Sequence, residues 1–154
     1  MTHFGDRVVE AVREKKTPTL VGLDPRPDLL PKSLVARHGL SVGASQRCWA
    51  RAVEEFCSRV LDVVASFVPA VKLQSAFFEL HGAAGIAAMR VILSKARRLG
   101  LLAILDAKRG DIGTTSQAYA EAAFGKLEEG EAAFAIGPGM PSADALTVSP
   151  YLGK

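Results

Sequence analysis

Residues 101–115 read LLAILDAKRGDIGTT, and the fold class of the chain follows from this stretch. The apolar run at its start is typical of a strand buried in a parallel sheet. If the strand continues through Lys108, the two-residue period of a strand directs the side chains of Asp106 and Lys108 to the same face. Asp111 and Thr115 then lie on the turn and the first helical residues that follow. Because ligands of α/β folds bind at the carboxyl ends of the strands, the stretch predicts a parallel sheet with a site at this end.

The rest of the chain alternates short apolar runs, which predict strands, with apolar residues at helical spacing. In chain order we expect a helix opening at Phe4, a strand at 19–23, a proline-rich loop and variable stretch to Ser45, a helix over 49–67, a strand at 69–73, a helix over 86–99 that stops at Gly100, a strand at 101–108, a helix over 114–127, a loop over 130–144 and a strand at 145–149. Such alternation predicts right-handed βαβ units.

The number of these units indicates a partial barrel. A (β/α)8 TIM barrel needs eight units and typically about 250 residues. This chain has 154 residues and about four units. We therefore expect an α/β fold in which residues 1–154 are the N-terminal part of a single barrel domain, with the C-terminal half absent.

Composition excludes several classes of function. No run reaches the ~18 apolar residues that a membrane span requires, and the N-terminus lacks a signal-peptide pattern, so we expect a cytoplasmic protein without a membrane partner. The net charge is only +3, and the one basic cluster, at 95–98, lies where cations complement a helix end. Aromatic residues make up 6% and are not interleaved with basic ones. We expect no nucleic-acid partner.

The cysteines and histidines indicate neither a local disulfide nor a metal site. Cys48 and Cys57 lie nine residues apart in one predicted helix, which places them on opposite faces. This usage fits a reducing compartment. His3, His38 and His81 are scattered without metal-ligand spacing, so we expect no bound metal.

Each of the first three predicted strands carries a charged residue at or near its carboxyl end, namely Asp24, Lys72, and Asp106 with Lys108. A charge within an apolar strand is costly unless it is paired, so Lys72 requires a partner. Side by side at a barrel mouth, Lys72, Asp106 and Lys108 would form a chain of alternating charge. A purely structural ion network would also explain the pattern, but its place at the ligand-binding end favours chemistry.

The same residues resemble the signature of the orotidine 5′-phosphate decarboxylase family in its longer bacterial form. That signature is Asp-x-Lys-x-x-Asp-Ile/Val, followed by a small residue and, two positions on, by Thr. It matches Asp106, Lys108, Asp111, Ile112, Gly113 and Thr115. The likeness continues in VGLDP at 21–25, VKLQSAFFE at 71–79 and TVSPYLG at 147–153. It therefore covers nearly the whole chain.

The resemblance implies loss of CO2 from C6 of orotidine monophosphate, without a cofactor, to give uridine monophosphate in pyrimidine synthesis. Lys108 would stabilise the C6 carbanion and protonate it. Asp106 would lie beside the substrate carboxylate and hold Lys108 in place. Lys72 would bridge the carboxylates and, with Asp24, contact the ribose.

The resemblance also implies a homodimer with shared sites. In the family, the residues that correspond to Asp111, Ile112 and Thr115 reach into the site of the partner subunit. Asp111 is therefore expected in the catalytic set, and Ile112 and Thr115 in the substrate-binding set.

Two other functions stay open. Keto-gulonate-phosphate decarboxylases and hexulose-phosphate synthases share the Asp-x-Lys-x-x-Asp motif but use a magnesium-stabilised enediolate, and the resemblance places an acidic residue where this chain has Lys72. A cation there repels Mg²⁺ and opposes that chemistry. Alternatively, the chain is a catalytically weak or inactive fragment that needs a complementary half, because the family's phosphate-binding loop and arginine come from later strands. Remote phosphate binding normally drives orientation at the reacting centre.

Overall fold

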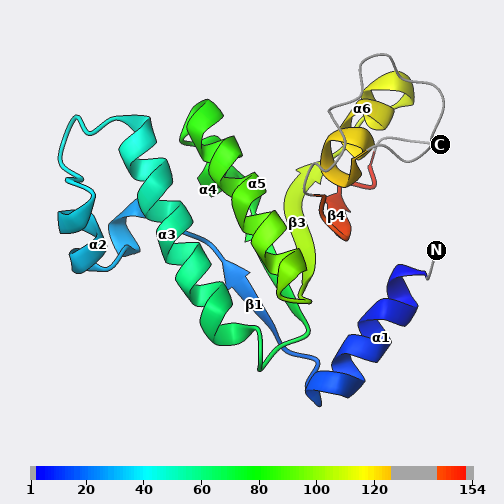
Figure 1. Ribbon diagram of the computed structural model, residues 1–154. Helices are drawn as coiled ribbons and strands as arrows, with labels where there is room; N and C mark the ends of the chain where they lie inside the picture. The colour runs from blue at the N-terminus through cyan, green and yellow to red at the C-terminus, as the bar shows by residue number, and fades with distance from the viewer. Residues whose placement is uncertain (1–2, 126–141, 152–154) are drawn as a thin grey trace.

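The computed structural model describes residues 3–125 and 142–151, which form an open parallel sheet with helices packed against it (Figure 1). In chain order the elements are α1 (Phe4–Lys15), β1 (Leu20–Leu23), the 3-10 helix η1 (Pro27–Leu29), α2 (Lys32–Arg37), α3 (Gln46–Val64), β2 (Ala70–Gln74), α4 (Ser75–Glu79), α5 (Gly82–Arg98), β3 (Leu102–Arg109), α6 (Gly113–Phe124) and β4 (Ala145–Val148).

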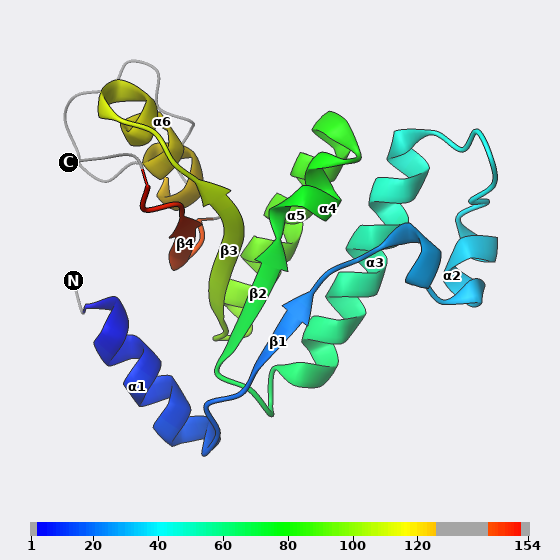
Figure 2. The same ribbon diagram turned by 180° about the vertical axis from the view of Figure 1, so that it is seen from behind.

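The order of the strands in the sheet is the order in the chain, β1-β2-β3-β4, and every pair is parallel. In register, Gly22 lies beside Lys72, which lies beside Ile104, which lies beside Ala145. Helices α3 and α5 lie on one face of the sheet, and the view from behind shows the strands in front of them (Figure 2). A doubly wound sheet would instead reverse its strand order at a switch point. The predicted α/β partial TIM barrel is confirmed.

The core lies between the sheet and the helices α3 and α5. Alternate strand residues point into it, and they are Leu23, Val71, Leu73, Ala103 and Leu105, all nearly fully buried. The opposite face of the sheet is less covered, since Leu20 is 41% exposed and Ile104 is only partly buried. This second face carries Lys72 and Asp106, so the alternation that builds the core also fixes which side of the sheet holds the charged residues.

The helix ends carry local signals that the sequence shows. Ser45 caps α3, because its hydroxyl accepts a hydrogen bond from the backbone N–H of Cys48 at 3.3 Å. Gly100, expected to stop a helix, follows α5 and has a φ of +75°, which glycine adopts without steric cost. Both cysteines are free thiols on α3, with Cys57 buried and Cys48 partly exposed.

Helix α1 is tied to the beginning of β4. Arg7 Nη2 lies 2.5 Å from Asp144 Oδ1, and the other carboxylate oxygen of Asp144 accepts the backbone N–H of Ala103 at 2.8 Å. None of the residues of α1 is buried. The ion pair at Asp144 is therefore a specific contact between this helix and the sheet.

The sequence prediction missed three short helices. The segment before Ser45, expected as a proline-rich loop and a variable stretch, contains η1 and α2, and the segment between β2 and α5, for which no element was predicted, contains α4. These helices have three to six residues, too few for a helical period to show. The loop expected over 130–144 lies outside the described residues except at 142–144.

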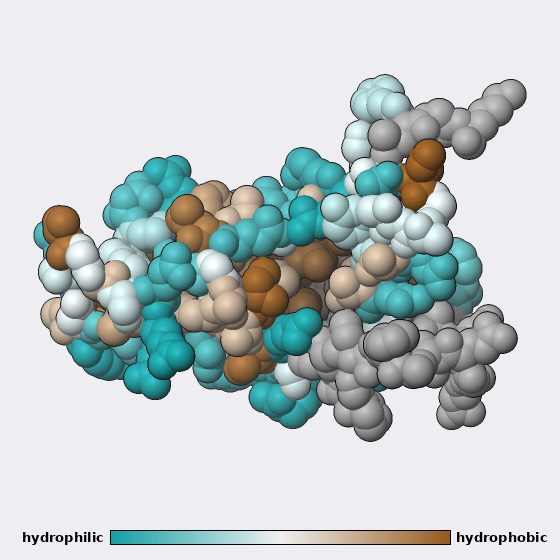
Figure 3. All heavy atoms as spheres, turned by 90° about the horizontal axis from the view of Figure 1, so that it is seen from above, coloured by the Kyte–Doolittle hydropathy of each residue, from teal (hydrophilic) through white to brown (hydrophobic). Residues whose placement is uncertain are grey.

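The surface is mixed in character. From above, hydrophilic side chains cover much of the face and hydrophobic ones interrupt it in several places (Figure 3). No helix among residues 3–125 and 142–151 is long and apolar enough to cross a membrane.

Candidate active site

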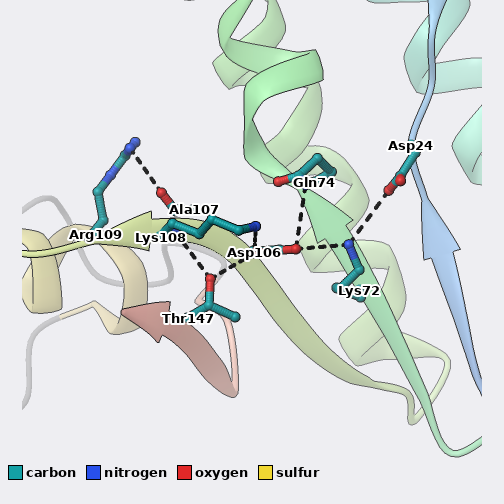
Figure 4. A network of polar contacts seen from close by, with 8 residues as sticks. All are labelled: Asp24, Lys72, Gln74, Asp106, Ala107, Lys108, Arg109 and Thr147. Carbon is teal, nitrogen blue, oxygen red and sulfur yellow. Dashed lines mark hydrogen bonds and ion pairs between the residues drawn. The ribbon is translucent and has the colours of Figure 1, made fainter. Parts of the chain in front are cut away.

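Charged side chains from three neighbouring strands meet at the carboxyl end of the sheet (Figure 4). Lys72 Nζ lies 3.0 Å from Asp106 Oδ2 and 3.8 Å from Asp24 Oδ1. Lys108 Nζ lies 2.7 Å from Asp106 Oδ1. The predicted chain of alternating charge is confirmed, and it includes Asp24 at its far end.

Asp106 is the centre of this network. Its Oδ2 accepts hydrogen bonds from Lys72 and from Gln74 Nε2 at 3.4 Å, and its Oδ1 accepts them from Lys108 and from Thr147 Oγ1 at 2.8 Å. The side chain is only 11% exposed. The hydrogen bond from Lys108 above all, then those from Lys72 and Thr147, hold the pKa of this carboxyl well below its usual range. Asp106 is therefore a fixed negative charge between two ammonium groups.

Lys108 reaches Asp106 through an irregular backbone. Its φ is +48°, in the left-handed region that non-glycine residues rarely adopt, and the pairing of β3 with β4 shifts register between Leu105 and Arg109. Its backbone N–H donates to Thr147 Oγ1 at 3.0 Å. The side chain is 66% exposed. Regular strand alternation, the basis of the prediction, is thus not what aims Lys108: a bulge with a strained residue does so.

Sequence reasoning did not single out Thr147 or Gln74 as site residues. Thr147 is on β4, where it bonds both the Asp106 carboxylate and the Lys108 backbone. The available signal was the repetition of polar residues at the ends of successive strands, which β4 continues with a hydroxyl. Gln74 lies at the end of β2, two residues after Lys72 and on the same face.

The other predicted residues lie apart from the network. Asp111, Ile112 and Thr115 are all exposed, on the turn after β3 and in the first turn of α6, as the sequence predicted for Asp111 and Thr115. The carboxylate of Asp111 accepts the N–H of Ile112 at 2.8 Å, and the Ile112 side chain is 66% exposed. The structure therefore brings four of the predicted site residues together and leaves these three facing solvent.

Among the described residues, no group of three or more His, Cys, Asp or Glu side chains is arranged to hold a metal ion. Asp24 and Asp106, the two carboxylates of the network, both lie against the ammonium of Lys72. Both carboxylates of the network are therefore paired with an ammonium group.

A parallel sheet of four strands whose order follows the chain, with a chain of charges at its carboxyl end, is typical of part of a (β/α)8 barrel with a polar site at the barrel mouth. The model of the orotidine 5′-phosphate decarboxylase / HUMPS family matches residues 17–154. The chain belongs to this family.

Two curated relatives and one solved structure show the extent of the likeness. The chain is 41% identical to an orotidine 5′-phosphate decarboxylase of Rhodopirellula baltica over 154 residues, which is 100% of this chain and 48% of the relative. It is 41% identical to one of Myxococcus xanthus over 140 residues, or 91% of this chain and 41% of the relative. It also matches the structure of Leishmania donovani OMP decarboxylase with a TM-score of 0.69 and 32% identity, over 99% of this chain and 46% of that one. The chain thus spans about half the length of these relatives.

Proposed function

We propose that residues 1–154 are the N-terminal part of a single orotidine 5′-phosphate decarboxylase barrel, which converts orotidine monophosphate to uridine monophosphate and CO2 without a cofactor. The observation that carries the proposal is the Lys72–Asp106–Lys108 chain, with both lysines bonded to one nearly buried carboxylate. Membership of the family and the similarity to decarboxylases of that name support the choice of substrate.

The proposed reaction explains why an ammonium is needed. The bond from C6 to the carboxylate breaks, CO2 leaves, and the electron pair stays on C6. Lys108 then transfers a proton from Nζ to C6. Two unit charges about 4 Å apart interact by about 4 kcal/mol even at an effective dielectric of 20. A fixed ammonium therefore lowers the energy of the carbanion that is hardest to form.

Asp106 has two roles in this proposal. Its bond to Lys108 holds the ammonium in place. Its own negative charge would lie beside the substrate carboxylate and disfavour the ground state, relative to a transition state in which that charge is leaving. Lys72, which bonds Asp106 and lies near Asp24, would contact the ribose together with Asp24.

The proposal includes a homodimer with shared sites. Asp111, Ile112 and Thr115 do not touch the network of their own chain and are exposed, which supports a role in a neighbouring copy.

The proposal also includes a reducing compartment such as the cytoplasm, which the two free thiols support.

A fragment that needs a complementary half is the second candidate, and the length of the relatives favours it. The chain covers only 41–48% of the curated decarboxylases described above. A magnesium-dependent relative is disfavoured by Lys72, whose ammonium lies 3.0 Å from Asp106 and places a cation where Mg²⁺ would need an anionic ligand.

The test is decarboxylation of orotidine monophosphate by the purified chain, followed through the loss of ultraviolet absorbance, with EDTA present. The informative variant is Lys108→Ala, and the matched control is Lys32→Ala, an exposed lysine at the start of α2. Turnover that persists in the control and vanishes in Lys108→Ala is the expected result.

Equal turnover in the wild type and in Lys108→Ala would overturn the proposed mechanism. A wild-type chain that binds a nucleotide analogue but shows no turnover would instead support the fragment that needs its complementary half. Activity that EDTA abolishes and Mg²⁺ restores would favour the magnesium-dependent alternative.

A further inference from the structure

A second polar cluster lies behind Lys108, and the proposed reaction makes no use of it. Arg109, the next residue, extends away from the charge network in Figure 4. Its Nη2 lies 2.5 Å from Glu79 Oε1 on α4, and its Nη1 donates to the carbonyl of Ala107 at 3.3 Å. The hydroxyl of Ser75 donates to the same Glu79 oxygen at 2.5 Å, and Tyr119 of α6 lies under the guanidinium at 5.4 Å.

These contacts surround the one strained residue of the site. A non-glycine residue in an unfavourable φ region costs of order 1–3 kcal/mol and persists only when its surroundings hold it there. Lys108 has a φ of +48°. On its two sides, the Ala107 carbonyl accepts the Arg109 side chain, and the Arg109 carbonyl accepts the backbone N–H of Ser149 at 2.7 Å.

The cluster also joins the ends of two strands that carry the site. Glu79 belongs to α4, which follows directly on β2, and Arg109 is the last residue of β3. The Arg109–Glu79 bond therefore fixes the end of β3 relative to the turn after β2. The same two strand ends carry Lys72 and Lys108, so the Arg109–Glu79 bond also constrains where Lys108 lies relative to Lys72 and to Asp106, the carboxylate that both lysines contact.

We propose that Arg109 and Glu79 are a positioning pair that holds the bulged end of β3, and so aims the Lys108 ammonium at Asp106. The pair itself does not touch the reacting atoms. The statement about Lys108 placement rests on the structure alone, whereas its effect on turnover rests on the proposed function.

Stability and the placement of Lys108 are two separate effects of the Arg109–Glu79 pair. Both side chains are more than a third exposed, at 35% and 38%, and exposed pairs of this kind contribute about 0–1 kcal/mol to stability. Loss of the pair should therefore change stability little, while it changes the placement of Lys108 measurably. The two effects can be separated by experiment.

The experiment is nitrogen-15 NMR of the lysine ammonium groups in the 154-residue chain, together with the HN–Hα coupling of residue 108 as a measure of its φ. The variants are Arg109→Lys, which keeps the charge but loses the planar fork, and Glu79→Gln, which removes the negative charge. Arg59→Lys is the matched control, because it alters another Arg–Glu pair, with Glu55 on the outside of α3. The Lys72 signal is an internal reference, since Lys72 bonds the same carboxylate from β2.

We expect the Lys108 ammonium signal and its coupling to change in both variants, with the Lys72 signal and the melting temperature close to wild type. Where the chain decarboxylates, kcat should fall by about ten- to a hundredfold with little change in KM, as expected for a misplaced catalytic group. An unchanged Lys108 signal in both variants, or equal changes at Lys72 and Lys108, would overturn the inference. If the wild-type chain is inactive, the NMR result still decides whether the pair positions Lys108. The inactivity itself then counts only against the proposed function.

Discussion

At the scale of single residues, Asp106 is the group on which the charges of the site depend. It receives four side-chain hydrogen bonds and is nearly buried. Those bonds hold its pKa well below that of an aspartate in an unfolded chain, which is about 3.9. The stabilisation is therefore complete above about pH 4 and is lost as the pH falls through the folded-state pKa, because only the unfolded chain takes up the proton in between.

This predicts a specific acid sensitivity. The free energy of unfolding of the wild type should decrease steadily below about pH 4. In Asp106→Asn, which has no carboxyl to titrate there, the decrease should be shallower, although the variant is less stable at neutral pH because two lysines lose their shared partner. Urea unfolding at a series of pH values measures this, with Asp6→Asn, an exposed residue of α1, as the control. Parallel curves for the wild type and Asp106→Asn would contradict the prediction.

The residues of the site also mark where sequence reasoning succeeds and fails. That Lys72, Asp106 and Lys108 meet follows from charges placed at the ends of successive buried strands. The left-handed φ of Lys108 carries no signal in the sequence, and it occurs where the pairing of β3 with β4 shifts register. Thr147 continues the series of polar residues at the strand ends, whereas the contact of Arg109 with Glu79 has no counterpart in that pattern.

At the scale of elements, the close approach of α4 to α5 depends on Gly85. A Cβ at this position would lie 1.9 Å from the carbonyl oxygen of Phe78 and 2.9 Å from the Cβ of His81. The short helix α4, which presents Glu79 toward Arg109, therefore packs against α5 at a distance that only glycine permits.

Gly85→Ala is accordingly predicted to destabilise the chain, by about 1–3 kcal/mol as is typical of overpacking. Helix propensity alone would predict the opposite, a gain of about 1 kcal/mol. Chemical denaturation with Ala83→Gly as a control, an exposed position in the same helix, separates the two effects. A more stable Gly85→Ala variant would show that α4 moves away at no cost.

The elements themselves were predictable to different degrees. Strands β2 and β3 and helices α3 and α5 were predicted to within a few residues because long apolar patterns define them. Helices α2 and α4 were not, since each buries few residues, such as Leu34 in α2 and Phe78 in α4. Such short helices are stabilised mainly by packing against the rest of the protein, so the spacing of apolar residues within the segment does not predict them.

At the scale of the whole molecule, the proposed shared site makes a prediction that a self-contained site does not. Asp111→Ala should damage the site of the neighbouring copy, whereas Lys108→Ala damages its own. Mixing the two inactive variants should then restore part of the activity, up to about a quarter of wild type if subunits assort at random and one intact site in each mixed dimer works fully. The measurement is turnover after the variants are mixed and allowed to exchange subunits, in an assembly where the wild type is active. Mixed dimers without any restored turnover would remove the shared-site proposal.

The contact between Arg7 and Asp144 has a consequence for how the chain is made. It joins two residues separated by 137 positions. On a ribosome, where the N-terminal end emerges first, α1 is complete long before its acceptor has been synthesised. Strands β1, β2 and β3 are each available to their neighbour well before that moment. We therefore expect α1 to gain its anchor to the sheet only after β1, β2 and β3 have been synthesised.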